Sequence, residues 1–152
     1  MVISHARFLI LQKRKQFLAV LRGGWLFGSG RSMRDYNLMR NVLVFISNDG
    51  ERTLNDFCHF GDVRSIGKEL SRLREEGLID SDMSFEPEYN GGRVRGLTAE
   101  GRAFVRDIEN DIVWELIRKT LDDSGLDLSY PLLKKVCETI VEHYVMSKIP
   151  EI

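Results

Sequence analysis

The chain is poor in cysteine, and this shortage excludes a class of small secreted folds. Its 152 residues contain two cysteines, Cys58 and Cys137, which stand far apart and form no CxxC pair. The spacing predicts neither a disulfide framework nor a metal site. We therefore expect two free thiols in a reducing compartment and a cytoplasmic location.

Long hydrophobic runs are missing as well. The apolar stretches at 8–11 and 17–21 are each followed by charged residues, so neither approaches the ~18 residues that a membrane-spanning helix needs. A secretory signal peptide is excluded, because it requires an uninterrupted apolar segment followed by a small-residue cleavage site. The sequence predicts no membrane partner.

Catalytic motifs are a third absence. The chain has no P-loop, no Gly-x-Gly-x-x-Gly, no His-Glu-x-x-His and no Gly-x-Ser-x-Gly pattern. Its three histidines, His5, His59 and His143, are scattered. Neither Cys58 with His59 nor Cys137 with His143 has the spacing of a metal site. We predict a protein that is not an enzyme and that uses no metal or cofactor.

Acidic residues are absent from the first 34 positions, which carry seven basic residues and a charge of +7. With those seven subtracted from the total of 22, residues 35–152 keep 15 basic against 23 acidic residues, a net charge of −8. Residues 1–32 therefore form a leader unlike the body. One interpretation is a basic amphipathic helix over about residues 4–22 that binds DNA, a lipid surface or an acidic partner. The competing interpretation takes Met33 as the natural start.

From Met33 onward, apolar periodicity and capping residues predict alternating helices and short strands. The expected helices occupy 33–47, 53–60, 62–76, 99–109, 111–122 and 130–148. The expected strands occupy 83–85 and 93–97, joined by a turn through Asn90-Gly91-Gly92. Asp62, Thr98 and Ser129 are the predicted N-caps, with Pro131 in the last helix's first turn.

Three helices, a hairpin and a fourth helix follow the order of a winged helix-turn-helix. The predicted fold class is therefore mainly α with a small β-hairpin, a winged helix-turn-helix plus two C-terminal helices. We assign 33–109 to the winged-helix domain and 110–152 to the helical extension. In the last helix, Leu133, Cys137, Ile140, Val141 and Tyr144 form an apolar stripe that must be covered, either by the winged domain or by a second copy.

Several short motifs of the body occur together in one known family. They are Met33-Arg34-Asp35, Leu38-Met39-Arg40, LSRLREEGLI at 70–79, Leu97-Thr98-Ala99-Glu100-Gly101 and NDIVWELIRK at 110–119. In this order the body resembles the prophage-associated winged-helix family catalogued as domain of unknown function 2513. The resemblance implies a bacterial or phage source and a DNA-binding-like fold, and it implies no biochemical activity. Gly96 departs from the family, which usually has Arg before Leu-Thr.

The third expected helix is the predicted DNA reader. Arg64, Lys68 and Arg72 are four residues apart, so they share one face, opposite a stripe of Val63, Ile66, Leu70 and Leu73. Ser65 and Gly67 are small enough to permit close approach to a groove. Arg93 and Arg95 alternate on the wing strand and are expected on one face. The predicted contacts to double-stranded DNA are Arg64, Ser65, Lys68, Arg72, Arg93 and Arg95.

Two observations oppose this function and keep an alternative open. Arg72 and Glu76 stand at ion-pair spacing, and an acidic body repels a phosphate backbone. The alternative is a protein-protein interaction module without DNA binding, whose partner is another protein or a second copy. Its expected anchors are Trp114, Ile117, Tyr144 and Val145. The competing interpretation of these four residues is that they fill the core.

Overall fold

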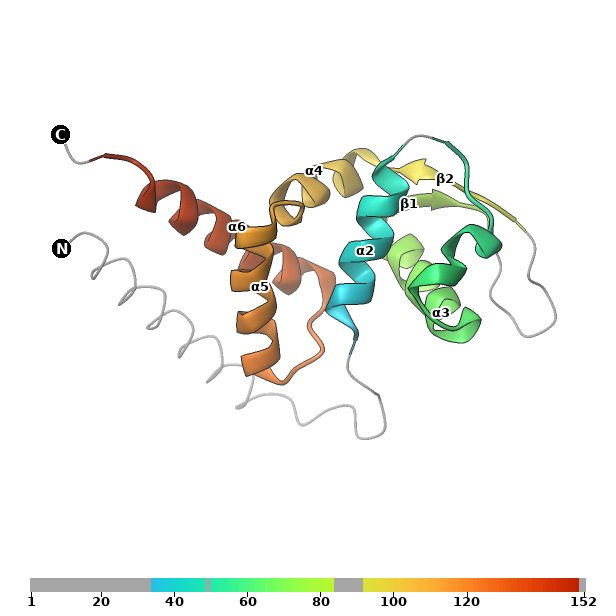
Figure 1. Ribbon diagram of the computed structural model, residues 1–152, viewed down its shortest axis with the longest axis horizontal. Coiled ribbons are helices and arrows are strands. Elements are labelled where there is room, and N and C mark those ends of the chain that lie inside the picture. The colour runs from blue at the N-terminus through green and yellow to red at the C-terminus, as the bar shows by residue number, and fades with distance from the viewer. Residues whose placement is uncertain (1–33, 49, 84–91, 151–152) are drawn as a thin grey trace. The chain divides into compact units, whose positions relative to one another are not determined.

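The computed structural model describes residues 34–48, 50–83 and 92–150 of the chain (Figure 1). The elements are α2 (Tyr36–Ser47), η1 (Leu54–Phe60), α3 (Val63–Glu75), β1 (Ile79–Ser81), β2 (Val94–Leu97), α4 (Ala99–Ile108), α5 (Asp111–Ser124) and α6 (Tyr130–Ser147). The predicted fold class is confirmed, since these are the elements of a winged helix followed by two C-terminal helices. The predictions for the leader and for residues 84–91 lie outside the described residues.

The chain divides into two compact units. One spans Arg34–Arg118 and contains the winged helix with the first part of α5, and the other includes the described residues 119–150. Of the apolar stripe predicted on α6, Leu133 and Cys137 are fully buried, whereas Ile140, Val141 and Tyr144 are only half-buried. Among the described residues, no helix is both long and apolar enough to cross a membrane.

Side-chain caps fix where the helices of the winged unit begin. The Asp62 carboxylate accepts a hydrogen bond from the Ser65 backbone N at 2.7 Å. The Thr98 hydroxyl accepts one from the Gly101 backbone N at 3.0 Å. Each bond satisfies a backbone N–H that the helix cannot pair internally. The caps predicted at Asp62 and Thr98 are therefore confirmed.

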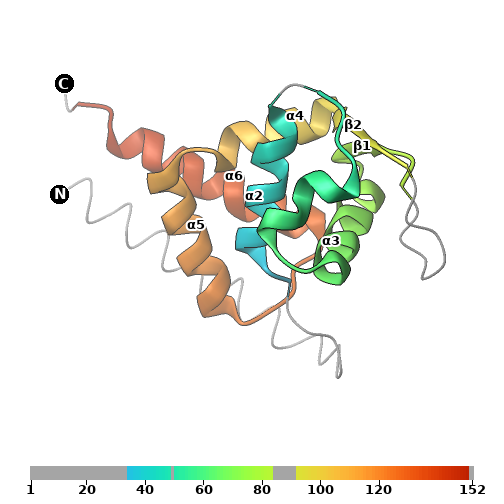
Figure 2. The same ribbon diagram turned by 45° about the vertical axis from the view of Figure 1, so that its right-hand side comes forward.

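The core of the winged unit surrounds α2. This helix packs against η1, α3, α4 and β2, and Figures 1 and 2 both show it between α3 and α4. Its residues Met39, Val42 and Leu43 are fully buried, as are Phe57 and Leu70 on the neighbouring elements η1 and α3. Burial of each such side chain contributes roughly 1.5–3 kcal/mol, so this apolar cluster holds α3 in place.

The hairpin begins earlier than predicted. Its register pairs Ile79 with Leu97 and Ser81 with Val94, with an irregularity between Asp80 and Ser81. The first strand predicted at 83–85 is wrong at Met83, which follows β1 rather than belonging to it, and residues 84 and 85 are not described. Met83 is outside the ladder because its backbone N donates to Ser81 Oγ and its carbonyl oxygen accepts from Arg74 Nη1, so neither group pairs with the opposite strand.

A further strand-like pairing joins the hairpin. Arg52 forms an isolated antiparallel bridge with Val94, in which each backbone N donates to the other residue's carbonyl oxygen, at 2.9 and 2.8 Å. A single bridged residue has no period, so the sequence did not indicate it. The bridge ties the segment before η1 to the base of the wing.

Candidate nucleic-acid interface

The outer edge of α3 carries three of the predicted DNA contacts. Arg64, Ser65 and Lys68 are exposed, while Ile66, Leu70 and Leu73 on the inner face are fully buried. Within the described part of the chain, neither the Arg64 guanidinium nor the Lys68 ammonium forms a hydrogen bond or an ion pair. Two cationic side chains without a hydrogen bond or ion pair in the described chain therefore lie one helical turn apart on this edge.

Two neighbours of these cations lie on the side opposite to the one predicted. Val63, expected in the buried stripe, is 49% exposed. Gly67, expected to leave room at the outer surface, is buried. The stripe does not include Val63, which is the first residue of α3. The room for an approaching groove is therefore at the tip of the helix and not at Gly67.

Ser65 is hydrogen-bonded to Asp62, the N-cap residue of α3. Its backbone N and its hydroxyl donate to the two oxygens of Asp62, at 2.7 and 3.0 Å. These bonds, with the Ser65 backbone N–H as the largest cause, hold the pKa of Asp62 below its ordinary value. The tip of α3 therefore carries a charged carboxylate, and the Ser65 hydroxyl keeps only its acceptor capacity for a ligand.

Arg72 differs from the other two cations of α3. Its Nε lies 3.7 Å from Glu76 Oε2, which confirms the predicted ion-pair spacing. The same Glu76 carboxylate accepts hydrogen bonds from Arg34, from Nη1 at 3.0 Å and from Nη2 at 2.8 Å. Arg72 therefore faces an ionic cluster at the end of α3 and is less available to DNA than Arg64 or Lys68.

Arg34 is part of that cluster and was missed as a structural residue. Its side chain is 1% exposed, and its Nε donates to Glu69 Oε1 at 2.9 Å. The sequence analysis counted Arg34 among the basic residues of the first 34 positions and placed it in the winged-helix domain, but did not predict its burial. Its partners are 35 and 42 positions away, and no helical or strand period connects residues that far apart.

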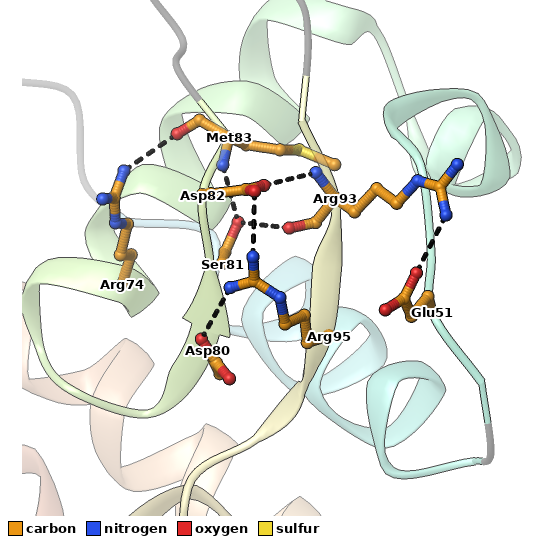
Figure 3. Close-up of polar contacts among 8 residues, drawn as sticks. All are labelled: Glu51, Arg74, Asp80, Ser81, Asp82, Met83, Arg93 and Arg95. Atoms are coloured by element: carbon orange, nitrogen blue, oxygen red, sulfur yellow. Dashed lines mark hydrogen bonds and ion pairs between the residues drawn. The ribbon is translucent and has the colours of Figure 1, made fainter.

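The wing arginines are paired with carboxylates, and they point in different directions (Figure 3). Arg93 reaches Glu51 at 3.0 Å, whereas Arg95 lies between Asp80 at 3.4 Å and Asp82 at 3.0 Å. The expectation that both arginines act from one face is therefore wrong. Arg93 lies just outside β2, and the register irregularity falls at Arg95, between Val94 and Gly96, which breaks the alternation that the prediction required.

Asp82 also organises the backbone at the base of the wing. It accepts a hydrogen bond from the Arg93 backbone N at 2.8 Å, and this bond is the largest cause that lowers the pKa of Asp82, with Arg95 adding to it. The carboxylate is therefore charged at neutral pH. It competes with any phosphate for the Arg95 guanidinium.

The residues predicted for a protein interface have separate locations. Trp114 and Ile117 on α5 are 3% and 0% exposed, so they belong to the core, as the competing interpretation predicted. The Trp114 indole donates to the Asn37 side chain at 3.1 Å. On α6, Tyr144 is half-buried and Val145 exposed. Of the four predicted anchors, Val145 is therefore the most accessible to a partner.

Comparison with known proteins finds a relative without an assigned role. The chain is similar to an uncharacterized protein of Haemophilus influenzae (strain ATCC 51907 / DSM 11121 / KW20 / Rd), with 30% identity over 112 residues, covering 71% of this chain and 94% of that protein. No family model and no solved structure matches the chain.

Proposed function

We propose that this chain, which belongs to the same family as the uncharacterized Haemophilus influenzae protein, is a non-catalytic regulator that binds double-stranded DNA through α3. The observation that carries the proposal is the pair Arg64 and Lys68, exposed on one edge of the helix and without a partner among the described residues. A winged helix-turn-helix uses this helix to enter the major groove. The motifs shared with domain of unknown function 2513 favour a phage or prophage setting, and the two free thiols favour a cytoplasmic location.

The local physics of α3 supports a functional use of Arg64. A cation near a helix N-terminus is unfavourable, because the helix dipole makes that end positive. The first turn of α3 nevertheless contains Arg64 and no acidic residue after the Asp62 cap. Residues that violate a local rule without structural compensation are expected at functional sites. Asp62 supplies a negative charge near Arg64, and a DNA phosphate or the acceptor atoms of a guanine would supply the direct hydrogen-bond partner.

The cations of the wing, unlike Arg64 and Lys68 on α3, are expected to contribute little to DNA binding. Arg93 and Arg95 are neutralised by Glu51, Asp80 and Asp82, so they contribute little to a counterion-release effect. Each phosphate contact contributes about −0.9 to the slope of log affinity against log salt. With Arg64 and Lys68 as the contacts, we expect a slope of about −2 per protomer, against about −4.5 if all five predicted cations engaged phosphate.

The test is fluorescence anisotropy of the full chain with a labelled duplex of mixed sequence across a salt series. The double variant Arg64→Glu/Lys68→Glu should lose binding and keep its helical circular dichroism. A matched control, Arg106→Glu/Lys119→Glu, makes the same charge change at two exposed positions on α4 and α5 and should retain most of the affinity. Equal losses from both variants would show that net charge, not α3, governs binding.

The basic leader needs its own variant. Changing Lys13, Arg14 and Lys15 to Ala removes three leader charges and leaves α3 untouched. If binding disappears in this variant and persists in Arg64→Glu/Lys68→Glu, the DNA contact belongs to the leader and the proposal for α3 is wrong.

A second function, a protein-protein interaction module, rests on the end of α6. Val145, Met146 and Ile149 are each more than half exposed, and exposed apolar clusters are common at protein interfaces. Sedimentation of the wild type and of Val145→Asp/Met146→Asp tests self-association through this cluster. A dimer that the variant abolishes, together with absent duplex binding, would favour the interaction module over the DNA-binding regulator.

A further inference from the structure

The guanidinium of Arg34 binds two carboxylates of α3 at once. Its Nε lies 2.9 Å from Glu69 Oε1, and its Nη1 and Nη2 lie 3.0 and 2.8 Å from the two oxygens of Glu76. Glu69 is in the middle of α3, whereas Glu76 is its C-cap, two helical turns later. One side chain from the segment before α2 therefore holds α3 at two points along the helix axis.

These hydrogen bonds are directional, unlike the apolar contacts of the same helix. Ile66, Leu70 and Leu73 on the inner face of α3 are fully buried, but the hydrophobic effect that holds them is non-directional and tolerates a small rotation or axial shift of the helix. A forked guanidinium binds a carboxylate only within a narrow range of distances and angles. The bonds of Arg34 therefore restrict the rotation of α3 more than its apolar packing does.

The energetics of this cluster favour a role in positioning over one in total stability. The side chains of Arg34 and Glu69 are 1% and 6% exposed. Taking two charges out of water costs much of the free energy that the ion pair returns, and well-packed apolar residues of similar volume often stabilise a fold as well or better. What the ion pair adds is the choice of one arrangement, which here is the arrangement of α3.

We infer that Arg34 is a positioning residue for DNA binding, which fixes the rotation of α3 so that Arg64 and Lys68 reach phosphates together. The inference rests on the proposed DNA-binding function and adds to it a buried residue that touches no DNA. Lys68 directly precedes Glu69 and lies about 100° from it around the helix axis. A rotation of α3 that releases Glu69 therefore also turns Lys68, and the expected cost is one of the two phosphate contacts.

The test is Arg34→Lys in the full chain, which keeps the positive charge but replaces the planar fork by one ammonium group. The variant should keep its helical circular dichroism at the temperature of the titration. Duplex affinity in fluorescence anisotropy should fall about tenfold, because one charge-assisted hydrogen bond is lost. The slope of log affinity against log salt should change from about −2 to about −1. A smaller folded fraction would lower the affinity without changing this slope.

Arg40→Lys is the matched control. Arg40 on α2 is also held through its fork, with Nε 2.9 Å from the Ile108 carbonyl oxygen and Nη2 2.7 Å from the Asp111 carboxylate. These bonds reach the end of α4 and the start of α5 rather than α3. The same substitution there should leave duplex affinity and the salt slope at their wild-type values.

Two results would overturn the positioning role while DNA binding stands. One is wild-type affinity and slope in Arg34→Lys, and the other is an equal change in Arg40→Lys. In both cases, loss of binding in Arg64→Glu/Lys68→Glu would still support the contact through α3. If the wild-type chain binds no duplex, the proposed function fails and the inference fails with it.

Discussion

The Arg34 guanidinium and the Glu69 carboxylate form a buried ion pair, with Arg34 Nη2 2.7 Å from Glu69 Oε1. The pair joins the residue that precedes the α2 N-cap to the middle of α3, and Glu76 binds the guanidinium through its other nitrogens. Because Glu69 lies on the inner face of the proposed DNA-reading helix, this contact fixes where α3 sits on the core. Removing one partner would leave a buried charge without compensation.

The first prediction concerns this pair. Arg34→Met should lower the free energy of unfolding by about 3–5 kcal/mol, because Glu69 and Glu76 then keep buried negative charge without their cation. Urea denaturation followed by circular dichroism measures the change. Arg106→Met, at an exposed position on α4, is the control and should stay within about 0.5 kcal/mol of wild type. A similar small effect of Arg34→Met would mean that the cluster is not a structural anchor.

The second prediction is a pH dependence that Glu69 introduces. Burial raises its pKa above the ordinary 4.5, against the attraction of Arg34. A raised pKa means that the folded state binds this proton more tightly than the unfolded state, so the stabilisation is complete below 4.5 and is lost as pH rises through the folded pKa. The unfolding free energy of wild type minus that of Glu69→Gln should therefore fall as pH rises from 4.5. A rising difference would mean that Arg34 outweighs burial.

The third prediction separates the wing from α3. Asp80→Asn/Asp82→Asn removes the carboxylates beside Arg95 and keeps an oxygen at position 82 that accepts from the Arg93 backbone N. Release of Arg95 should raise duplex affinity at low salt and steepen the salt slope by about 0.9. Anisotropy titrations measure both quantities. Glu100→Gln/Glu109→Gln gives the same charge change on and beside α4, and an equal steepening there would remove any special role for Arg95.

The fourth prediction concerns the contact between α4 and the hairpin. Gly101 is buried, and a Cβ added to it would collide with the Leu78 backbone carbonyl. Gly→Ala in a helix normally stabilises by about 1 kcal/mol, but Gly101→Ala should destabilise by about 1–3 kcal/mol because backbone atoms cannot move aside cheaply. Thermal denaturation gives the sign. Ala103→Gly, at an exposed position of the same helix, reports the propensity term alone, and a stabilised Gly101→Ala would contradict the clash.

Much of the helical architecture followed from the sequence alone. Asp62 and Thr98 were identifiable as caps because an N-cap bond joins residues three apart. Leu70 and Leu73 on α3 and Val42 on α2 were identifiable as core residues, because the helical period places each of them on the apolar face of its own helix. The order of elements then specified a winged helix. In each case the determining interaction is local or periodic along the chain.

The state of each functional side chain was decided by tertiary structure. Arg34 is buried against Glu69, and Arg93 and Arg95 pair with carboxylates, in each case with residues that are distant in the sequence. Val63 is half-exposed although its spacing predicted burial. No helical or strand period along the chain indicates these outcomes. Arg64 and Lys68 form no hydrogen bond or ion pair within the described chain, although Asp62 lies close enough to Arg64 for the arginine to help lower its pKa. Charge spacing along a helix determines which residues share a face, whereas only the folded neighbours determine which of those charges are available to a ligand.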